Sequence, residues 1–400
     1  MISVKSAHRW LSAAYGLKMG FILPVIVLFY GYKGVSIGDF FLIQGIMRLF
    51  IFITEIPTGY VGDVFSRKHT LILGYLVYAT GYLWWLFGSG FWFMLGGELF
   101  FSVGISLISG TLEAYLYDIL KKRHKEDKYH FKLAKMTTIM NTTLMIATFS
   151  GAFIYHFFGP TAPVWLSLFC MLGATIILCF LPDVPEAKRI VAKDKSKLQD
   201  ICDISKFAIK HHEIKWLMLF PALYGTLTLV FWWGLQPVML EQNIPVFAFS
   251  IVSSAAAFIR IIWSALSGKT LDKFHLSGVI KILCITIVAG ACASCCAVYM
   301  PAWATFVCLF IMSIGAGSSV LAKTANSVLI NHRIKSDERA TVLSVNSMID
   351  KAFTGIGMIC LKPLFDNIGI GQTFMVSALL LIPILICARH LYKMKLTTRG

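Results

Sequence analysis

Long apolar stretches recur along the chain at nearly even spacing, and they constrain the fold more than any other feature. Each stretch has about 20 residues or more with few charges, the length that a helix needs to cross the hydrocarbon core of a membrane. The predicted spans are residues 10–31, 39–62, 70–89, 91–120, 133–158, 161–181, 214–240, 246–267, 278–300, 302–330, 338–364 and 370–392. The sequence therefore predicts an all-α membrane protein with twelve transmembrane helices.

The composition supports this fold class. Hydrophobic residues make up 57% of the 400 residues, charged residues only 14%, and the mean hydropathy is +0.74. Soluble domains carry about 25% charged residues, so a soluble enzyme and a nucleic-acid-binding domain are excluded despite the net charge of +16. The basic residues gather in alternate loops, which places both termini in the cytoplasm. We expect a multi-pass protein of the inner (plasma) membrane.

A lysine-rich segment at residues 182–213 contains Pro182 and Pro185 and separates the spans into two sets of six. We predict an N-terminal six-helix bundle at 1–181, a cytoplasmic linker at 182–213 and a C-terminal six-helix bundle at 214–400. Apolar residues recur at helical spacing within the linker. Two interpretations stay open for it: an amphipathic helix on the membrane surface and a solvated connection.

One short loop sequence occurs twice. The chain reads Gly59-x-x-x-Asp63 after the second predicted span and Gly268-x-x-x-Asp272 after the eighth. The two aspartates are 209 residues apart, which is about half the chain. We interpret the pair as the mark of an internal repeat, as in transporters built from two related halves.

The first of these loops resembles the signature of the major facilitator superfamily, Gly-x-x-x-Asp-Arg-x-Gly-Arg-Arg/Lys. Gly59, Asp63, Arg67 and Lys68 match the signature, whereas its first arginine and second glycine are replaced by Val64 and Ser66. The resemblance implies two pseudo-symmetric six-helix bundles. Three further segments resemble a bacterial branch rich in drug and metabolite exporters: Glu55-Ile-Pro-Thr-Gly59, Ser109-Gly-Thr-Leu-Glu113-Ala-Tyr-Leu-Tyr-Asp118 and Arg339-Ala-Thr-Val-Leu-Ser344.

The resemblance also implies that these loops act as a gate. In the family the loop aspartate caps the N-terminus of the eleventh span, where unpaired N–H groups and the helix dipole stabilise a carboxylate. Here Asp63 would reach residues 336–339. Asp118 ends the fourth predicted span at the same membrane level as this loop, and we expect it to pair with Arg67. A fixed structural salt bridge is the alternative. The predicted gating residues are Gly59, Asp63, Arg67, Lys68, Asp118, Asp272 and Arg339.

Ionisable residues inside the spans form a second candidate site, because a charge in the bilayer is costly and marks function. Counted along the helices, four of them reach similar depths in the membrane and are expected to share one polar cluster: Lys18, Arg48, Glu55 and Glu113. Glu55 is the first choice for the proton acceptor, ahead of Glu113 and Asp350. The alternative is that Glu55 is permanently paired with Arg48 or Lys18. The predicted proton-coupling and cavity residues are Lys18, Arg48, Glu55, Glu113, Arg260, Lys323 and Asp350.

The remaining sequence features do not indicate a catalytic or metal-binding site. Glu98 is expected near the outer surface as a water-exposed residue. The sequence has no ATP-binding loop, catalytic motif or cluster of metal ligands, so we expect no enzymatic activity, no cofactor and no metal. Cys292-x-x-Cys295 is interpreted as apolar packing, with a redox or metal role as the alternative.

These features lead to a functional hypothesis. The chain is expected to be a monomeric secondary transporter that works by alternating access in the lipid bilayer, with a small-molecule substrate, protons as the coupling ion and no nucleic-acid partner. The resemblance favours export of a small amphiphilic drug or antimicrobial metabolite. The excess of basic over acidic groups in the spans favours the alternative, import of an anionic or zwitterionic nutrient. A transport-dead receptor is the remote third hypothesis.

Overall fold

The computed structural model describes residues 4–64, 66–122, 124, 128–181, 212–274, 276–333 and 339–393. The regular elements within these ranges are helices, and no strand occurs among them. The predicted linker at 182–213 lies almost wholly outside the described residues, and so does its amphipathic helix. Contacts within the chain divide it into two compact units.

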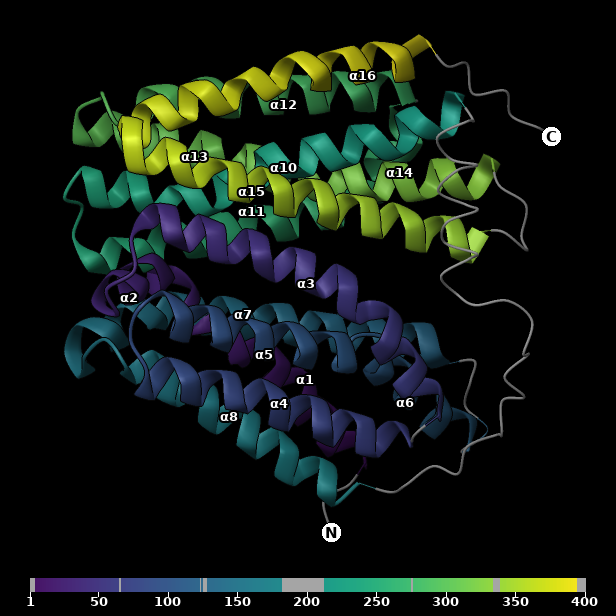
Figure 1. Ribbon diagram of the computed structural model, residues 1–400. Coiled ribbons are helices and arrows are strands. Elements are labelled where there is room, and N and C mark those ends of the chain that lie inside the picture. The colour runs from purple at the N-terminus through teal and green to yellow at the C-terminus, as the bar shows by residue number, and fades with distance from the viewer. Residues whose placement is uncertain are drawn as a thin grey trace. The chain divides into compact units, whose positions relative to one another are not determined.

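Unit 1 comprises residues 1–193 and 245–254. Within it α4 packs on α5 and α8, while α1 packs on α7 and α8. Most of this unit is drawn in purple to blue in Figure 1. Its helices are α1 (Val4–Gly20), η1 (Leu23–Val25), α2 (Ile26–Tyr32), α3 (Ile37–Val64), α4 (Arg67–Phe87), α5 (Phe91–Ile108), α6 (Thr111–Lys121), α7 (Tyr129–Phe158) and α8 (Ala162–Cys179).

Unit 2 comprises residues 194–244 and 255–400, so that α11 begins in unit 1 and continues in unit 2. The helix α10 is its centre, because α13, α14, α15 and α16 all pack on it. Figure 1 shows α12 and α16 side by side. Its helices are α10 (His212–Glu241), α11 (Val246–Lys273), α12 (Leu276–Ala297), α13 (Ala302–Gly317), α14 (Ser319–Arg333), α15 (Arg339–Ser377), η3 (Ala378–Leu380) and α16 (Leu381–Lys393).

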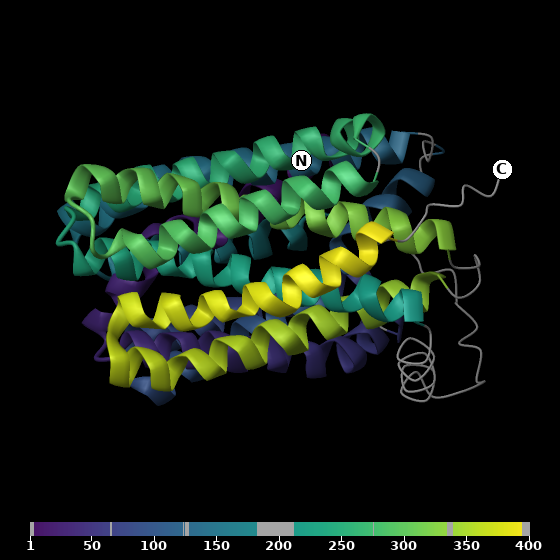
Figure 2. The same cartoon turned by 90° about the horizontal axis from the view of Figure 1, so that it is seen from above.

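Eleven helical segments in the described ranges are long and apolar enough to cross a membrane. The last of them, Val345–Tyr392, has 48 residues. At a rise of 1.5 Å per residue it would be about 70 Å long, more than twice the hydrocarbon thickness of about 30 Å. It is interrupted within α15 at Gly369, whose φ of 80° favours glycine, and Figure 2 shows the chain reversing where the ribbon passes from yellow-green to yellow. This segment therefore supplies two spans, and the all-α, twelve-span fold is confirmed.

Three of the predicted spans are not continuous helices. The first is interrupted around Pro24, which cannot donate a backbone hydrogen bond. The fourth breaks at Ser109–Gly110, where Gly110 has a φ of 73°, and the tenth breaks at Ser318. The predicted spans at 10–31, 91–120 and 302–330 are each found as one candidate membrane span, but each is built from two or more successive helices. The break at Gly110 places Glu113 in the first turn of a new helix, α6.

The internal repeat extends from the loop sequences to the helices that carry them. The helices α3 and α11 each have 28 residues, and both their starts and their ends are 209 residues apart. This is the separation of Asp63 and Asp272, which lie in the last turns of these helices. The two halves of the sequence therefore repeat a whole helix.

The loop after α2 is held by a buried lysine. The Nζ of Lys33 donates hydrogen bonds to the carbonyl oxygens of Leu86 and Gly88 at 2.8 and 2.9 Å. The backbone N–H of Gly90 in turn donates to the carbonyl oxygen of Lys33 at 2.7 Å. Burial lowers the pKa of the Lys33 ammonium. One side chain thus ties the α2–α3 loop to the α4–α5 loop.

Lys33→Met should lower the stability of the folded protein while its apolar chain still fits. Two buried carbonyl oxygens would lose their donor, and each such loss costs roughly 1–3 kcal/mol. Thermal unfolding of the detergent-solubilised protein measures the effect. The control is Lys362→Met, because Lys362 forms an exposed pair with Asp366 one turn away, and such pairs contribute about 0.5 kcal/mol. Equal midpoints for the two variants would contradict the assignment.

Candidate functional site

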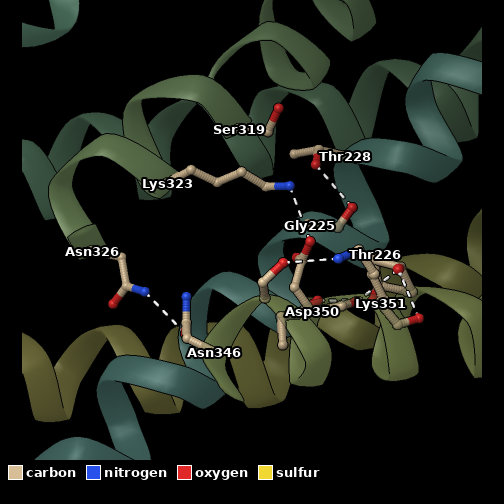
Figure 3. Close-up of polar contacts among 12 residues, drawn as sticks. Gly225, Thr226, Thr228, Ser319, Lys323, Asn326, Asn346, Asp350 and Lys351 are labelled. Atoms are coloured by element: carbon tan, nitrogen blue, oxygen red, sulfur yellow. Dashed lines mark hydrogen bonds and ion pairs between the residues drawn. The ribbon is translucent and has the colours of Figure 1, made fainter. Parts of the chain in front are cut away.

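An ion pair inside unit 2 is the centre of the candidate site (Figure 3). Lys323 on α14 donates from Nζ to Asp350 Oδ2 on α15 at 3.0 Å. The Lys323 side chain is 58% exposed on the surface of the protein and that of Asp350 only 17%. An ammonium within a membrane span does not face hydrocarbon. The exposed side of this pair therefore faces water or a ligand.

Asp350 lies directly against the backbone of α10. A Cβ atom added to Gly225 would be only 2.8 Å from Asp350 Oδ1. The same oxygen is buried and has no hydrogen-bond partner among the described residues. Gly225 thus leaves the space that the carboxylate occupies, with one oxygen against α10 and the other on Lys323.

Gly225→Ala should therefore slow transport about tenfold. The added methyl group must displace the carboxylate of Asp350, and overpacking of this kind costs about 1–3 kcal/mol. The control is Gly173→Ala on α8, where an added Cβ meets no atom within 4 Å. Initial rates of solute uptake by the purified proteins in vesicles measure the effect. Equal rates for wild type and Gly225→Ala would show that the close approach is unimportant.

Amide and hydroxyl groups surround the ion pair in Figure 3. Asn326 lies one turn after Lys323 on α14 and donates from Nδ2 to Asn346 Oδ1 at 3.2 Å. Asn346 itself lies one turn before Asp350 on α15. Lys351 donates to Ser347 Oγ at 2.9 Å. The helices α14 and α15 therefore present both charges and hydrogen-bonding groups close together.

The predicted residue Arg260 also lies in unit 2. It is an exposed residue of α11, and its guanidinium carbon is 4.9 Å from the ring centroid of Trp232 on α10. This is the geometry of a cation–π interaction. No ion pair of Arg260 is found in the part of the chain that the structure describes. The guanidinium therefore lies over an aromatic ring.

The cluster predicted in the N-terminal half is not assembled as expected. Lys18 is buried with its Nζ 3.8 Å from the ring centroid of Tyr15 and 4.6 Å from that of Tyr78. Glu113 is exposed, and its charge together with burial raises the pKa of Tyr129. Among the described side chains no ion pair joins Lys18 to Glu113. Depth counting assumed a straight fourth span, whereas the break at Gly110 reorients α6.

Two other members of that predicted cluster lie on α3. Arg48 is half-buried and lies one turn after Gln44, on the same face of the helix. The side chain of Glu55 lies outside the described residues, so the choice of Glu55 as proton acceptor stays a prediction. The alternative pairing of Glu55 with Arg48 or Lys18 also stays open.

The structure brings together part of the predicted gating set. The Nη1 atom of Arg67 at the start of α4 lies 2.6 Å from Asp118 Oδ2 on α6, as the sequence predicts. Lys68 donates to the carbonyl oxygens of Cys179 and Leu181 at 3.0 and 2.7 Å, and so caps the end of α8. The role of these contacts in gating stays a prediction.

The rest of the gating set is described only by its backbone. Gly59 and Asp63 lie in α3, Asp272 lies in α11, and Arg339 begins α15. Their side chains lie outside the described residues, and so does the predicted contact of Asp63 with residues 336–339.

Glu98 is a functional candidate that was not predicted from the sequence. It was expected to be water-exposed, but its side chain is fully buried in unit 1. Glu98 Oε1 accepts hydrogen bonds from Tyr30 Oη at 2.8 Å and from Gln44 Nε2 at 2.6 Å. Oε2 has no partner among the described residues. The expectation is wrong because aromatic side chains, among them Tyr30 and Trp85, pack together at this depth.

A signal for this cluster was present in the sequence. Gln44 lies seven residues after the start of α3, and Glu98 lies seven residues after the start of α5. Both helices follow loops that the charge pattern places outside the cell, so the two polar residues enter the membrane to the same depth of about 10 Å. Equal depth in neighbouring helices predicts a hydrogen bond.

The comparisons with known proteins agree with this architecture. The sequence pattern of the Major Facilitator Superfamily matches residues 10–358. The chain belongs to this superfamily. It is a multi-pass membrane protein, as the resemblance of the first loop implied.

Two curated relatives of this superfamily member match parts of the chain. An uncharacterized transporter of Buchnera aphidicola is 28% identical over 197 residues, which are 48% of this chain and 48% of the relative. The sugar transporter ERD6-like 2 of Arabidopsis thaliana is 24% identical over 172 residues, 40% of this chain and 37% of the relative. The chain thus spans half or less of the length of the curated relatives that it matches.

Solved structures match the superfamily member over nearly its whole length. The nucleoside transporter NupG aligns with a TM-score of 0.83 at 14% identity, covering 98% of this chain and 100% of NupG. The D-xylose-proton symporter aligns with a TM-score of 0.72 at 12% identity, covering 98% of both chains. At these identities the likeness shows a shared fold.

Proposed function

We propose that this transporter moves a small hydrophilic solute with a negatively charged group, and that a proton gradient drives the movement. The observation that carries the proposal is the ion pair of Lys323 and Asp350. Lys323 is exposed and Asp350 is mostly covered, so a solute reaches the ammonium more easily than the carboxylate. The solute carboxylate or phosphate then competes with Asp350 for Lys323.

The surroundings of the pair favour a hydrophilic solute over an amphiphilic drug. The amides of Asn326 and Asn346 and the hydroxyl of Ser347 lie within one turn of the two charges. A few well-placed polar groups of this kind fix the orientation of a small ligand. NupG and the D-xylose-proton symporter, both of the same fold, are named for hydrophilic solutes, which supports the same class here.

The preference for a hydrophilic solute over an amphiphilic drug also favours import over export. We propose import by proton symport through alternating access, in the inner membrane with both termini in the cytoplasm. The Arg67–Asp118 ion pair then holds the cytoplasmic side of the transporter closed when it is formed and allows that side to open when it breaks. The resemblance to an exporter branch favours the opposite direction for an amphiphilic compound, and the test includes that outcome.

The test is an uptake panel with the purified protein in phosphatidylethanolamine–phosphatidylglycerol vesicles under an imposed inward proton gradient. Labelled carboxylates, amino acids, sugar phosphates, nucleosides and sugars are compared for wild type, Lys323→Gln and Glu55→Gln. Accumulation of an anionic or zwitterionic solute by wild type, lost in Lys323→Gln, supports the proposal. Loss in Glu55→Gln as well would favour the sequence-based choice of proton acceptor.

A parallel growth assay covers the competing hypothesis. A host without its main efflux systems expresses the same proteins and meets a set of toxic amphiphilic compounds. Protection by the wild type, combined with no uptake of charged solutes, would replace the proposal with export. Proton-driven uptake of uncharged solutes alone would also contradict it, because the ammonium of Lys323 would then have no role in recognition.

A further inference from the structure

The buried carboxyl of Glu98 takes no part in the candidate substrate site, which lies in the other unit. Its cluster joins three helices of unit 1: Tyr30 comes from α2, Gln44 from α3 and Glu98 from α5. A carboxyl group in the membrane interior is costly and marks function. Packing alone does not need it, because a hydrophobic side chain of the same size fills such a position at lower cost.

We propose that Glu98 is the site that binds the coupled proton, on its unpartnered oxygen Oε2, and that the bound proton loosens the attachment of α2 and α3 to α5. This inference rests on the proton coupling of the proposed function. It assigns the coupling to a residue outside the set predicted from the sequence.

The hydrogen bonds of Glu98 determine which oxygen receives the proton. The phenol of Tyr30 and the amide nitrogen of Gln44 both donate to Oε1. Oε1 is thus the acceptor in either state of the carboxyl group, and Oε2 is the oxygen left without a donor among the described residues. A proton taken up from water forms the O–H bond at Oε2, and its loss returns the carboxylate.

The groups that face Glu98 allow both states. Burial favours the neutral acid, since an ionised carboxylate loses its hydration. The two donors on Oε1, and Arg48 one turn after Gln44 on α3, favour the carboxylate. From α4 the rings of Tyr78 and Tyr82 pack on Phe101, which lies one turn after Glu98 on α5.

The proton would change the contacts of the two helices that Glu98 holds. Hydrogen bonds to a charged carboxylate are shorter and roughly twice as strong as those to a neutral acid. Proton binding therefore weakens the bonds from Tyr30 on α2 and Gln44 on α3. Asp63 of the Gly59-x-x-x-Asp63 loop sequence lies 19 residues after Gln44 on α3, about 28 Å along the same helix. Gln44 of the proton site and the predicted gate thus lie on the same helix.

The first experiment uses the proton as its probe and needs no substrate. Infrared spectra of the full-length protein in phosphatidylethanolamine–phosphatidylglycerol vesicles are recorded across a pH titration. We expect a protonated-carboxyl band that disappears as the pH rises and that is missing in Glu98→Gln. Tyr30→Phe keeps the carboxyl and removes one donor to its ionised form, so the band should persist to higher pH. Identical titrations for wild type and Glu98→Gln would overturn the proposal.

The second experiment separates coupling from a structural role. Glu98→Gln should still exchange labelled for unlabelled solute without a gradient, at a rate within about twofold of wild type. Its accumulation driven by a proton gradient should fall at least tenfold. Retained accumulation would overturn the proposal, and so would loss of exchange together with accumulation, because that pattern is structural.

The same measurement distinguishes failure of the inference from failure of the proposed function. Wild type that exchanges solute but never accumulates it under a proton gradient would contradict proton coupling itself. Wild type that accumulates solute while Glu98→Gln does so equally well would contradict only the assignment of the proton to Glu98. Asp366→Asn, which alters an exposed pair, is the control and should leave both readouts unchanged.

Discussion

Lys323→Gln should weaken the binding of the transported solute ten- to hundredfold and nearly stop its uptake. The substitution removes the ammonium that pairs with the solute, and a hydrogen bond to a charged group contributes about 1.5–3 kcal/mol, with each 1.4 kcal/mol worth a factor of ten. The exposure of Lys323, at 58%, keeps the effect toward the lower part of this range because water screens the charge. Solute binding to the purified protein, measured by calorimetry, checks the prediction.

Asp350→Asn should raise the affinity for the solute, whereas Lys323→Gln lowers it, and both substitutions should slow transport. Without the competing carboxylate, Lys323 should hold the solute more tightly, and slow release should reduce turnover. An ion pair with only a structural role would respond in the same direction to both substitutions. Lys362→Gln removes the lysine of the exposed pair with Asp366 and should leave binding and turnover unchanged, so it is the matched control.

Arg67→Gln and Asp118→Asn should each lower turnover about tenfold and leave solute binding within about twofold. Their ion pair of 2.6 Å joins the start of α4 to α6, and both side chains are mostly covered, so its loss is expected to cost about 1–2 kcal/mol of the closed conformation. Uptake rates and equilibrium binding, measured on the same preparations, separate the two effects. Exchanging the charges, with Arg67→Glu and Asp118→Arg together, should restore part of the turnover.

The gate hypothesis also predicts that Asp63→Asn stops transport while the protein still reaches the membrane. Unchanged flux in that variant would contradict the gate. If Arg67→Gln and Asp118→Asn lower only the thermal unfolding midpoint and not the turnover of the folded protein, the pair is a fixed structural salt bridge. Asp366→Asn provides the control for removal of an exposed carboxylate.

The sequence by itself determined the spans and their repeat. A helix that crosses hydrocarbon must be apolar for about 20 residues, because no water is present to pair with polar groups. Each span is therefore a run of consecutive apolar residues, which can be recognised in the sequence without knowledge of the tertiary structure. The separation of Asp63 and Asp272 likewise predicted a repeat that the bounds of α3 and α11 reproduce. The pairing of Arg67 with Asp118 was predicted from the membrane level that the ends of their spans share.

The tertiary structure decided which of the buried polar residues in the candidate sites meet. Glu98 accepts from Gln44, 54 residues away in the chain, and Asp350 occupies the space beside Gly225, 125 residues away. Such contacts depend on the rotation of each helix about its axis and on breaks such as that at Gly110. The apolar length of a span determines neither the rotation of its helix nor the position of such a break. The bilayer therefore specifies the helices through local composition, whereas side-chain packing between helices specifies the site.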